Sequence, residues 1–300
     1  KQDSVSNALT LEALAYGDLS LAMSVSVPML TAKIIAEHGS EEQQTALLPE
    51  LANGSIFHVG LGINNVSLAT DPYQSSVLAI ESGEEIILNG SKTGIAFAEE
   101  AKTFLISASN ESGECNLYFV NKDQDGVELE EKEFMGIKGA PLSQINLSKC
   151  KINASQKLGG HNYSLNYQSL VDSSRIGMSA LALGVCQAVL DYVVPYTNER
   201  VAFNEPISNR QSVAFMIADM AIETEALRLM VYKSAALKDL DEDFHKQASL
   251  TYRFAAHHGM KIGTDGVQLL GGHGFTHEHP VELWYRNLRA IGIFEGGAGV

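Results

Sequence analysis

Apolar residues recur every three or four positions through the first fifty residues of the chain. This period, which runs from position 11 to position 36, is typical of helices packed on a core. Ser40 and Gln43 have the spacing of a helix capping box, and Asn53-Gly54 is a helix stop signal. The pattern predicts an N-terminal α-helical domain over residues 1–54, present here in part.

After residue 55, short apolar runs alternate with turn residues. The clearest runs lie at residues 57–61, 85–88, 103–107 and 117–120. The turn signals between runs are Ser82-Gly83, Asn89-Gly90 and Ser112-Gly113. This spacing predicts roughly six to eight short strands, and hence a middle β-domain over residues 55–155.

Three long segments with one strongly apolar face follow, at residues 164–197, 208–240 and 242–270. Their length predicts a C-terminal α-helical bundle over residues 156–300, also present in part. The most apolar stretch, residues 176–190, is interrupted by Gln187 and is too short to cross a bilayer. We therefore expect a buried core helix there and no membrane span. The fold class that follows is α+β with three domains, in the order helical, β, helical.

The net charge of the chain argues against some classes of binding partner. The chain has 300 residues, with 21 Lys and Arg against 36 Asp and Glu, and a formal net charge of −15. This balance argues against a nucleic-acid-binding surface and against a general attraction to anionic lipid. Because the chain starts at Lys1 rather than Met, we expect both natural ends to be missing. The expected location is the cytoplasm of a bacterium, or the mitochondrial matrix if the source is eukaryotic.

Metal ligands are sparse. The three cysteines form no close pairs, which fits a reducing compartment and argues against a thiolate zinc site; they are Cys115, Cys150 and Cys186. Five histidines lie in the last fifty residues, at His257, His258, His273, His277 and His279. No carboxylate or cysteine pattern completes a site around them, so we expect no metal.

A glutamate near the C-terminal end is the strongest candidate for acid–base chemistry. Glu295 follows Phe294 in an apolar stretch and precedes Gly296-Gly297. Apolar surroundings raise the pKa of a carboxylate and make it a better base near neutral pH. The glycines allow the backbone to approach a ligand closely. Taken alone, Glu295 could equally cap a helix or pair with Arg286 or Arg289.

Two arginines are candidates for contact with a ligand. Arg200 offers a planar, permanently charged donor suited to a pyrophosphate, although a cation at a helix C-terminus also interacts favourably with the helix dipole. Arg175 follows Asp172 at the predicted start of a long helix. The plain interpretation of that pair is an acidic cap followed by a surface arginine.

Three C-terminal motifs resemble those of the acyl-CoA dehydrogenases. They are Asp172-Ser173-Ser174-Arg175; Arg200-Val201-Ala202-Phe203 with Gln211; and Gln268 to Phe275, followed by Trp284-Tyr285-Arg286 and Phe294-Glu295-Gly296-Gly297. The last two look like the family signatures R-x-x-F-G…Q and Q-x-x-G-G-x-G-F…R-D…Y-E-G-T. The spacings match, and the resemblance covers nearly the whole chain. It implies the family's helical domain, β-domain and four-helix bundle, with FAD as cofactor.

The resemblance also implies roles for individual residues. Glu295 would take the α-proton of an acyl-CoA thioester while the β-hydrogen leaves as a hydride to flavin N5, as in fatty-acid β-oxidation. Some family members carry their base at the position of Ser174, which cannot serve. Arg175, Asp172 and Phe294 would contact the acyl-CoA. Contacts with FAD are implied for Arg200, Phe203, Gln211, Gln268, Gly271, Gly272, Thr70 and Asn64.

The resemblance implies partners as well. An electron-transfer flavoprotein would accept the electrons. The arginine that matches Arg200 reaches the FAD of a neighbouring subunit in the family. This implies a homo-oligomer, either a dimer or a tetramer, or a hetero-oligomer with a homologue.

The β-domain departs from the family pattern. The motif T-E-P-x-A-G-S-D has become N-N-V-S-L-A-T-D, so Asn64 replaces a flavin-binding hydroxyl and only Thr70-Asp71 remain of the last pair. In N-G-x-K-x-W-I-T-N, Gly94 replaces the stacking Trp and Ala96 replaces the Thr that bonds flavin N5. Each loss costs on the order of a kcal/mol. Phe97 is a candidate to replace the lost ring.

These departures leave a second interpretation open. The chain could be a divergent, weakly catalytic or non-catalytic subunit that shares its flavin with a more complete homologue. A third interpretation, a structural protein that retains only the fold, ranks last because the C-terminal motifs are largely intact. A visible spectrum separates the first two, because a dehydrogenase binds FAD and is bleached by its substrate.

Overall fold

The computed structural model describes residues 3–53, 58–67, 71–294 and 299. Its helices are α1 (Ser4–Gly17), α2 (Leu19–His38), α3 (Glu41–Ala52), α4 (Tyr167–Glu199), α5 (Gln211–Asp239), α6 (His245–Leu270) and α7 (Val281–Ile291). Its strands are β1 (Val59–Gly62), β2 (Leu78–Ser82), β3 (Glu85–Ala96), β4 (Thr103–Ser109), β5 (Cys115–Asn121), β6 (Val127–Lys132), β7 (Leu142–Asn153), β8 (Val201–Ala202) and β9 (Glu205–Pro206). The order helical, β, helical confirms the predicted fold class.

The N-terminal helices are punctuated by side-chain caps. Asp18 ends α1 and caps α2, so the expected helical run is split into separate helices. The capping box predicted from Ser40 and Gln43 is confirmed. Gln43 also accepts the N–H of Gly159 at 3.0 Å, which ties the start of α3 to the exit of the β-domain.

Strands β1 to β7 form one sheet, with the order β1-β4-β2-β3-β7-β6 and with β5 paired to β4. The long strands β3 and β7 are antiparallel, with Glu85 opposite Asn153. Strand β1 instead runs parallel to β4. Ile86, Leu88 and Phe104 are fully buried in the core of this domain. The predicted strands at 85–88, 103–107 and 117–120 are confirmed within β3, β4 and β5.

The prediction of a turn at Asn89-Gly90 is wrong. These residues lie inside β3, where the pairing with β7 shifts register between Leu88 and Gly90. Gly90 has φ +133°, and a Cβ there would lie 2.3 Å from the carbonyl oxygen of Ser76. The glycine therefore serves a bulge in a continuous strand. The turns predicted at Ser82-Gly83 and Ser112-Gly113 do connect strands, and both glycines have positive φ.

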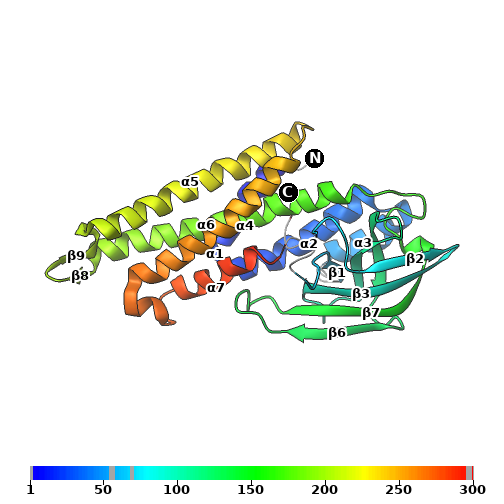
Figure 1. Cartoon of the computed structure of the whole chain (residues 1–300). Helices are drawn as coiled ribbons and strands as arrows, with labels where there is room; N and C mark the ends of the chain where they lie inside the picture. The colour runs from blue at the N-terminus through cyan, green and yellow to red at the C-terminus, as the bar shows by residue number, and fades with distance from the viewer. Residues whose placement is uncertain (1–2, 54–57, 68–70, 295–298, 300) are drawn as a thin grey trace.

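Helix α4 is the axis of the bundle and packs against α1, α5, α6 and α7 (Figure 1). It begins at Tyr167, and the side chain of Asn166 caps it by accepting the N–H of Ser169 at 3.1 Å. Asp172 therefore lies inside the helix, and the interpretation of Asp172 as its acidic cap is wrong. The carboxylate has tertiary partners instead, described below.

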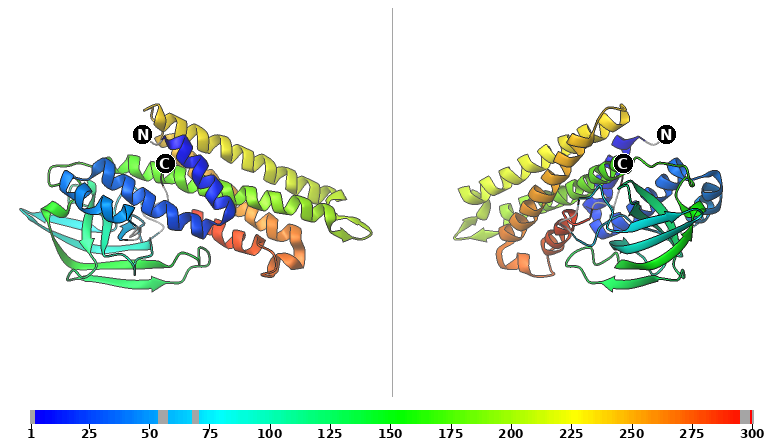
Figure 2. Two further views of the ribbon diagram at one scale, coloured as in Figure 1. Left: turned by 180° about the vertical axis from the view of Figure 1, so that it is seen from behind. Right: turned by 45° about the vertical axis from the view of Figure 1, so that its right-hand side comes forward.

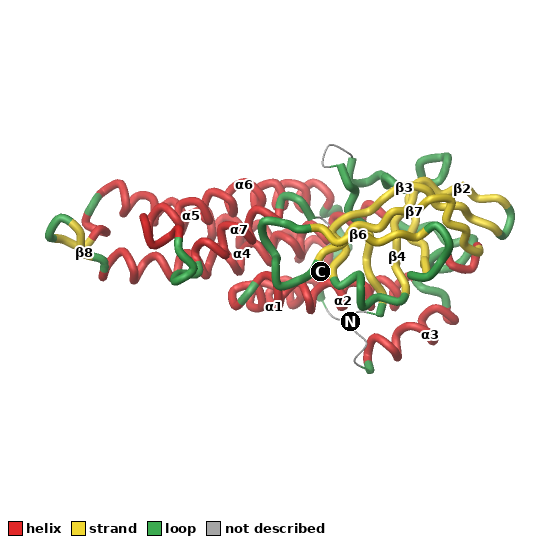
Figure 3. Tube along the Cα trace, turned by 90° about the horizontal axis from the view of Figure 1, so that it is seen from below, coloured by secondary structure: helices red, strands yellow, loops and turns green. Residues whose placement is uncertain are grey.

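The β-domain and the far end of the bundle lie at opposite ends of the molecule. The β8–β9 hairpin is at the tip of the bundle, far from the sheet (Figure 2). Seen from below, α1 and α2 run alongside the bundle and the sheet, and α3 lies beside the sheet (Figure 3). Helices α2 and α4 are long and apolar enough to pass a length-and-hydropathy test for membrane spans. However, 61% and 78% of their most apolar windows are buried inside the protein, which is the behaviour of core helices.

Candidate active site

Asp172 and Arg175 lie on one face of α4, where the β-domain meets the bundle. Asp172 is 2% exposed and the Arg175 side chain is 11% exposed, so the surface-arginine interpretation is wrong. Their charged atoms are 3.8 Å apart, longer than a hydrogen bond. Other side chains form hydrogen bonds with both charged groups.

Three residues that sequence reasoning missed surround this pair. The Tyr73 hydroxyl donates to Asp172 Oδ1 at 2.7 Å and accepts a hydrogen bond from Arg175 Nη1. His245 Nδ1 lies 2.8 Å from Asp172 Oδ2, and Arg175 Nη1 donates to Ser249 Oγ at 2.9 Å. We call these five residues the junction cluster.

The protonation of Tyr73 sets the direction of these bonds. Burial is the main cause that raises the pKa of Tyr73 to about 12, and the hydrogen bond to Asp172 raises it further. The hydroxyl therefore stays protonated at neutral pH and donates to the carboxylate. His245 and Ser249 stand four residues apart on α6, a spacing that places them on one helix face. That spacing was the available sequence signal for the pair.

The Arg175 guanidinium also lies against two aromatic rings. Its central carbon is 5.0 Å from the centroid of the Tyr73 ring and 5.7 Å from that of Tyr252. The Tyr252 hydroxyl in turn donates to the carbonyl of Ile291 at 2.7 Å. The junction cluster is thereby linked to the end of α7, just before Phe294.

Phe294 is 1% exposed and lies against Gly94 of β3. A Cβ on Gly94 would be 2.5 Å from Phe294 Cε1 and 3.4 Å from Asn64 Nδ2, so three predicted positions converge. Phe134 packs edge-to-face on Phe294, with centroids 5.4 Å apart. The ring beside Gly94 belongs to Phe294. That Phe97 replaces the lost ring stays a prediction.

Two of the predicted site residues, Glu295 and Thr70, lie outside the described residues. The prediction for Glu295 therefore depends on its neighbour Phe294, whose position is described. Arg286, one of the alternative partners considered for Glu295, is already engaged. Its Nε donates to Glu282 at 2.7 Å, and its Nη1 donates to the carbonyl of Met135 at 3.1 Å.

A second group of predicted residues lines a cavity of about 370 Å³ at the tip of the bundle. This distal cavity is lined by the predicted residues Arg200, Phe203, Gln268, Gly271 and Gly272. Arg200 is the C-cap residue of α4, and Phe203 and Asn204 after it both have left-handed φ. Gln211 is the first residue of α5 and is not among the lining residues.

The glycines of the distal cavity leave its wall open. Gly271 has φ +58° and ψ −130°, a conformation that favours glycine. A Cβ on Gly271 or Gly272 would meet no described atom within 4 Å. The guanidinium of Arg210 lies 4.6 Å from the ring of Phe203, which is 83% exposed. An elongated anionic ligand can therefore reach the backbone of this wall.

The two groups of predicted residues are far apart within one chain. Arg175 and Arg200 sit on the same helix, so they are separated by roughly 37 Å at 1.5 Å per residue. In Figure 1 the sheet and the β8–β9 hairpin lie at opposite ends of α4.

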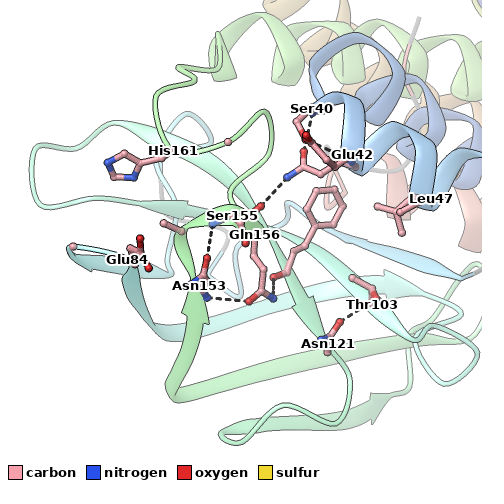
Figure 4. Close-up of a pocket in the computed structure, with 16 residues that line it drawn as sticks. Ser40, Glu42, Leu47, Glu84, Thr103, Asn121, Asn153, Ser155, Gln156 and His161 are labelled. Atoms are coloured by element: carbon pink, nitrogen blue, oxygen red, sulfur yellow. Dashed lines mark hydrogen bonds between the residues drawn. The ribbon is translucent and has the colours of Figure 1, made fainter.

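Larger cavities lie elsewhere. One of about 990 Å³ lies between α3 and the sheet, where Figure 4 shows Ser40, Asn153 and His161 around it. None of the predicted site residues lines it. Another, of about 740 Å³, lies between α1, α2 and the α5–α6 turn, and includes Ser169 and Phe244, close to Asp172 and His245 in sequence.

The C-terminal histidines pair with aromatic residues. The rings of His273 and His279 stack with centroids 5.3 Å apart, and their Nδ1 atoms bond the hydroxyls of Tyr196 and Tyr192. In the part of the chain that the structure describes, no three His, Cys, Asp or Glu side chains gather as metal ligands.

Comparison with known proteins identifies the chain's relatives. Models of the N-terminal, middle and C-terminal domains of acyl-CoA dehydrogenase match residues 1–55, 66–150 and 166–300. The short/branched chain specific acyl-CoA dehydrogenase of Rattus norvegicus mitochondria is 30% identical, over 98% of this chain and 69% of its own length.

Solved structures agree. A glutaryl-CoA dehydrogenase of Mycobacterium smegmatis in complex with FADH2 superposes with a TM-score of 0.87 at 26% identity, over 98% of this chain and 76% of that one. A chain in a structure described as the electron transferring flavoprotein of Acidaminococcus fermentans gives 0.85 at 30% identity, over 98% and 79%. This chain belongs to the acyl-CoA dehydrogenase family of FAD-dependent oxidoreductases.

Proposed function

We propose that the protein oxidises an acyl-CoA thioester to the α,β-unsaturated enoyl-CoA. The observation that carries the proposal is the position of Phe294. This ring is buried against Gly94 of the β-domain, and Tyr252, which lies against Arg175, bonds the carbonyl of Ile291 three residues before it. In this proposal the Glu295 carboxylate takes the α-proton. FAD, when bound, accepts the β-hydrogen as a hydride.

The chain's own residues supply binding and orientation. Arg175 holds the thioester end of the substrate, Asp172 helps to fix the side of the site that carries Arg175, and Phe294 shields the reacting carbons from water. A carboxylate in apolar surroundings has a raised pKa and is a better base near neutral pH. Chain length and branching of the acyl group are left open by this proposal.

The residues of the chain fit FAD in two separate groups, each of which would hold one part of the cofactor. Arg200 and Gln268 provide a cation and an amide in the distal cavity, and the open backbone at Gly271 and Gly272 admits a pyrophosphate. Asn64 lies beside Gly94 and offers an amide to the flavin ring edge. Because roughly 37 Å of helix separates Arg175 from Arg200, we propose that one FAD is held by two copies of the chain. The assembly is then a homo-oligomer, or a hetero-oligomer with a homologue.

An electron-transfer flavoprotein is the proposed electron acceptor. Support comes from the likeness to a chain of the Acidaminococcus structure, whose description names such a flavoprotein. The test is reoxidation of the reduced protein by a purified electron-transfer flavoprotein, followed as return of the flavin band. Failure to reoxidise in the presence of that flavoprotein contradicts this part of the proposal.

The visible spectrum of the purified protein with FAD, before and after addition of an acyl-CoA panel, tests the main reaction. We expect a flavin band that one class of acyl-CoA bleaches. Glu295→Gln should keep the band and abolish bleaching. Glu278→Gln, at an exposed position, is the matched control and should bleach as the wild type does. A protein that stays colourless with FAD would instead support the non-catalytic subunit.

A further inference from the structure

The hydroxyl of Tyr73 is the meeting point of the junction cluster. We propose that Tyr73, with His245 and Ser249, is a positioning residue that holds Arg175 and Asp172 in the geometry that binds the acyl-CoA. This inference rests on the proposed function and adds to it residues that do not touch the reacting carbons.

The hydrogen-bond donors and acceptors of the junction cluster come from three parts of the chain. Tyr73 lies in the loop before β2, Asp172 and Arg175 on α4, and His245 and Ser249 on α6. Arg175 donates to the Tyr73 oxygen, and the Tyr73 hydroxyl donates to Asp172. The phenol thus bridges a cation and an anion that form an ion pair at 3.8 Å, a distance too long for a direct hydrogen bond.

Burial of the Asp172 carboxylate costs free energy of hydration. A carboxylate that is 2% exposed loses most of its hydration and must be compensated by hydrogen bonds. Tyr73 serves one oxygen at 2.7 Å and His245 serves the other at 2.8 Å. With both oxygens engaged, the carboxylate has a fixed orientation.

The Arg175 guanidinium is also held in place by its neighbours. Arg175 is held from two sides, by the rings of Tyr73 and Tyr252, and by the hydroxyl of Ser249. Tyr252 is anchored on the carbonyl of Ile291, four residues before Glu295. The placement of Arg175 relative to the segment that carries the proposed base is therefore set by side chains from the β-domain and α6 and by a backbone carbonyl of α7.

The variant Tyr73→Phe tests the inference, because it removes the hydroxyl but keeps the ring against Arg175. We expect kcat/KM for the acyl-CoA to fall about ten-fold or more, the loss typical of a hydrogen bond to a charged group. The spectroscopic Kd for acyl-CoA should rise in parallel, while the affinity for FAD is unchanged. Ser249→Ala should act in the same direction and provides a second variant if Tyr73→Phe folds poorly.

The matched control is Tyr163→Phe, which removes another partly buried hydroxyl bonded to a histidine, His38, at 2.7 Å. It should leave kcat/KM and the acyl-CoA Kd at wild-type values. At His245, the conservative His245→Gln retains a donor for Asp172 and should keep most activity, whereas His245→Ala should not. Such rescue separates positioning from packing.

The outcomes distinguish this inference from the function it rests on. If no acyl-CoA bleaches the wild-type flavin, the proposed function and this inference are both overturned. If the wild type is bleached and Tyr73→Phe and Ser249→Ala match Tyr163→Phe in kcat/KM and Kd, only this inference is overturned.

Discussion

The ring of Phe294 occupies the space directly against the α-carbon of Gly94. A Cβ at position 94 would lie 2.5 Å from Phe294 Cε1, and the glycine has φ +67°, a left-handed conformation. Position 94 is where the resemblance places a tryptophan. Here the aromatic ring comes from the C-terminal domain, so a side chain at position 94 would compete with Phe294 for the same volume.

Gly94→Ala should therefore destabilise the protein by about 2–5 kcal/mol. A residue in a left-handed conformation costs about 1–2 kcal/mol, and overpacking adds about 1–3. Gly113→Ala is the matched control, because Gly113 has φ +85° but a Cβ there meets no described atom within 4 Å. Gly113→Ala should lose only the stability that the left-handed backbone conformation costs. Equal urea midpoints for the two variants would show that Phe294 yields without penalty.

Lys92 should make stability rise with pH above neutrality. It is fully buried in β3, and burial lowers its pKa to about 7. Its ammonium donates to the carbonyl of Ile63 at 3.1 Å and to Asn65 Oδ1 at 2.7 Å. The unfolded chain holds the proton up to the ordinary lysine pKa of about 10.4, so it binds more protons than the native state between these values.

The free energy of unfolding of the wild type, minus that of Lys92→Met, should accordingly increase from pH 7 to pH 9. Its slope should approach about 1.4 kcal/mol per pH unit. Urea unfolding at several pH values measures this difference. Parallel pH curves for the two proteins contradict the assignment of the titration to Lys92.

Glu12 and Arg228 should form a strongly stabilising pair between α1 and α5. The Glu12 side chain is 13% exposed and also accepts a hydrogen bond from Tyr232, while Arg228 Nη2 donates to Gln187 at 2.6 Å. Removing one partner of such a pair leaves the other charge poorly solvated. We expect Glu12→Ala to lower the free energy of unfolding by about 2–4 kcal/mol.

Glu225 provides the control for this pair, because it contacts the same guanidinium at 3.2 Å but is 64% exposed. Glu225→Ala should cost less than about 1 kcal/mol, as exposed pairs do. Thermal unfolding of both variants compares the two carboxylates on one arginine. Similar losses would mean that burial does not set the value of the Glu12 contact.

Arg200→Ala should weaken FAD binding by about ten- to a hundred-fold, the range for a hydrogen bond to a charged group. Arg253→Ala, at an exposed position of α6, is the control and should leave the affinity unchanged. Fluorescence titration of the apoprotein with FAD measures both. Unchanged affinity in Arg200→Ala would remove the distal cavity from the cofactor site.

Local signals predicted local structure well. The capping box of Ser40 and Gln43 depends on neighbours three residues apart, and it formed as predicted. The Asn89-Gly90 pair has the same local character, yet it became a bulge, because pairing along β7 continues past it. Cross-strand hydrogen bonds from a distant segment outweighed the turn preference of two residues.

The candidate site likewise depends partly on local signals in the sequence and partly on contacts between distant segments. The sequence by itself determined the order of the domains and the family, because helical and strand periods and motif spacings are properties of the chain. It could not reveal that Tyr73 meets Asp172 and His245, which lie 99 and 172 residues further along. Nor could it show that Phe294 fills the space above Gly94. Only tertiary packing decides which distant side chains share a buried volume, since the cost of desolvating a charge or overfilling a core depends on every neighbour at once.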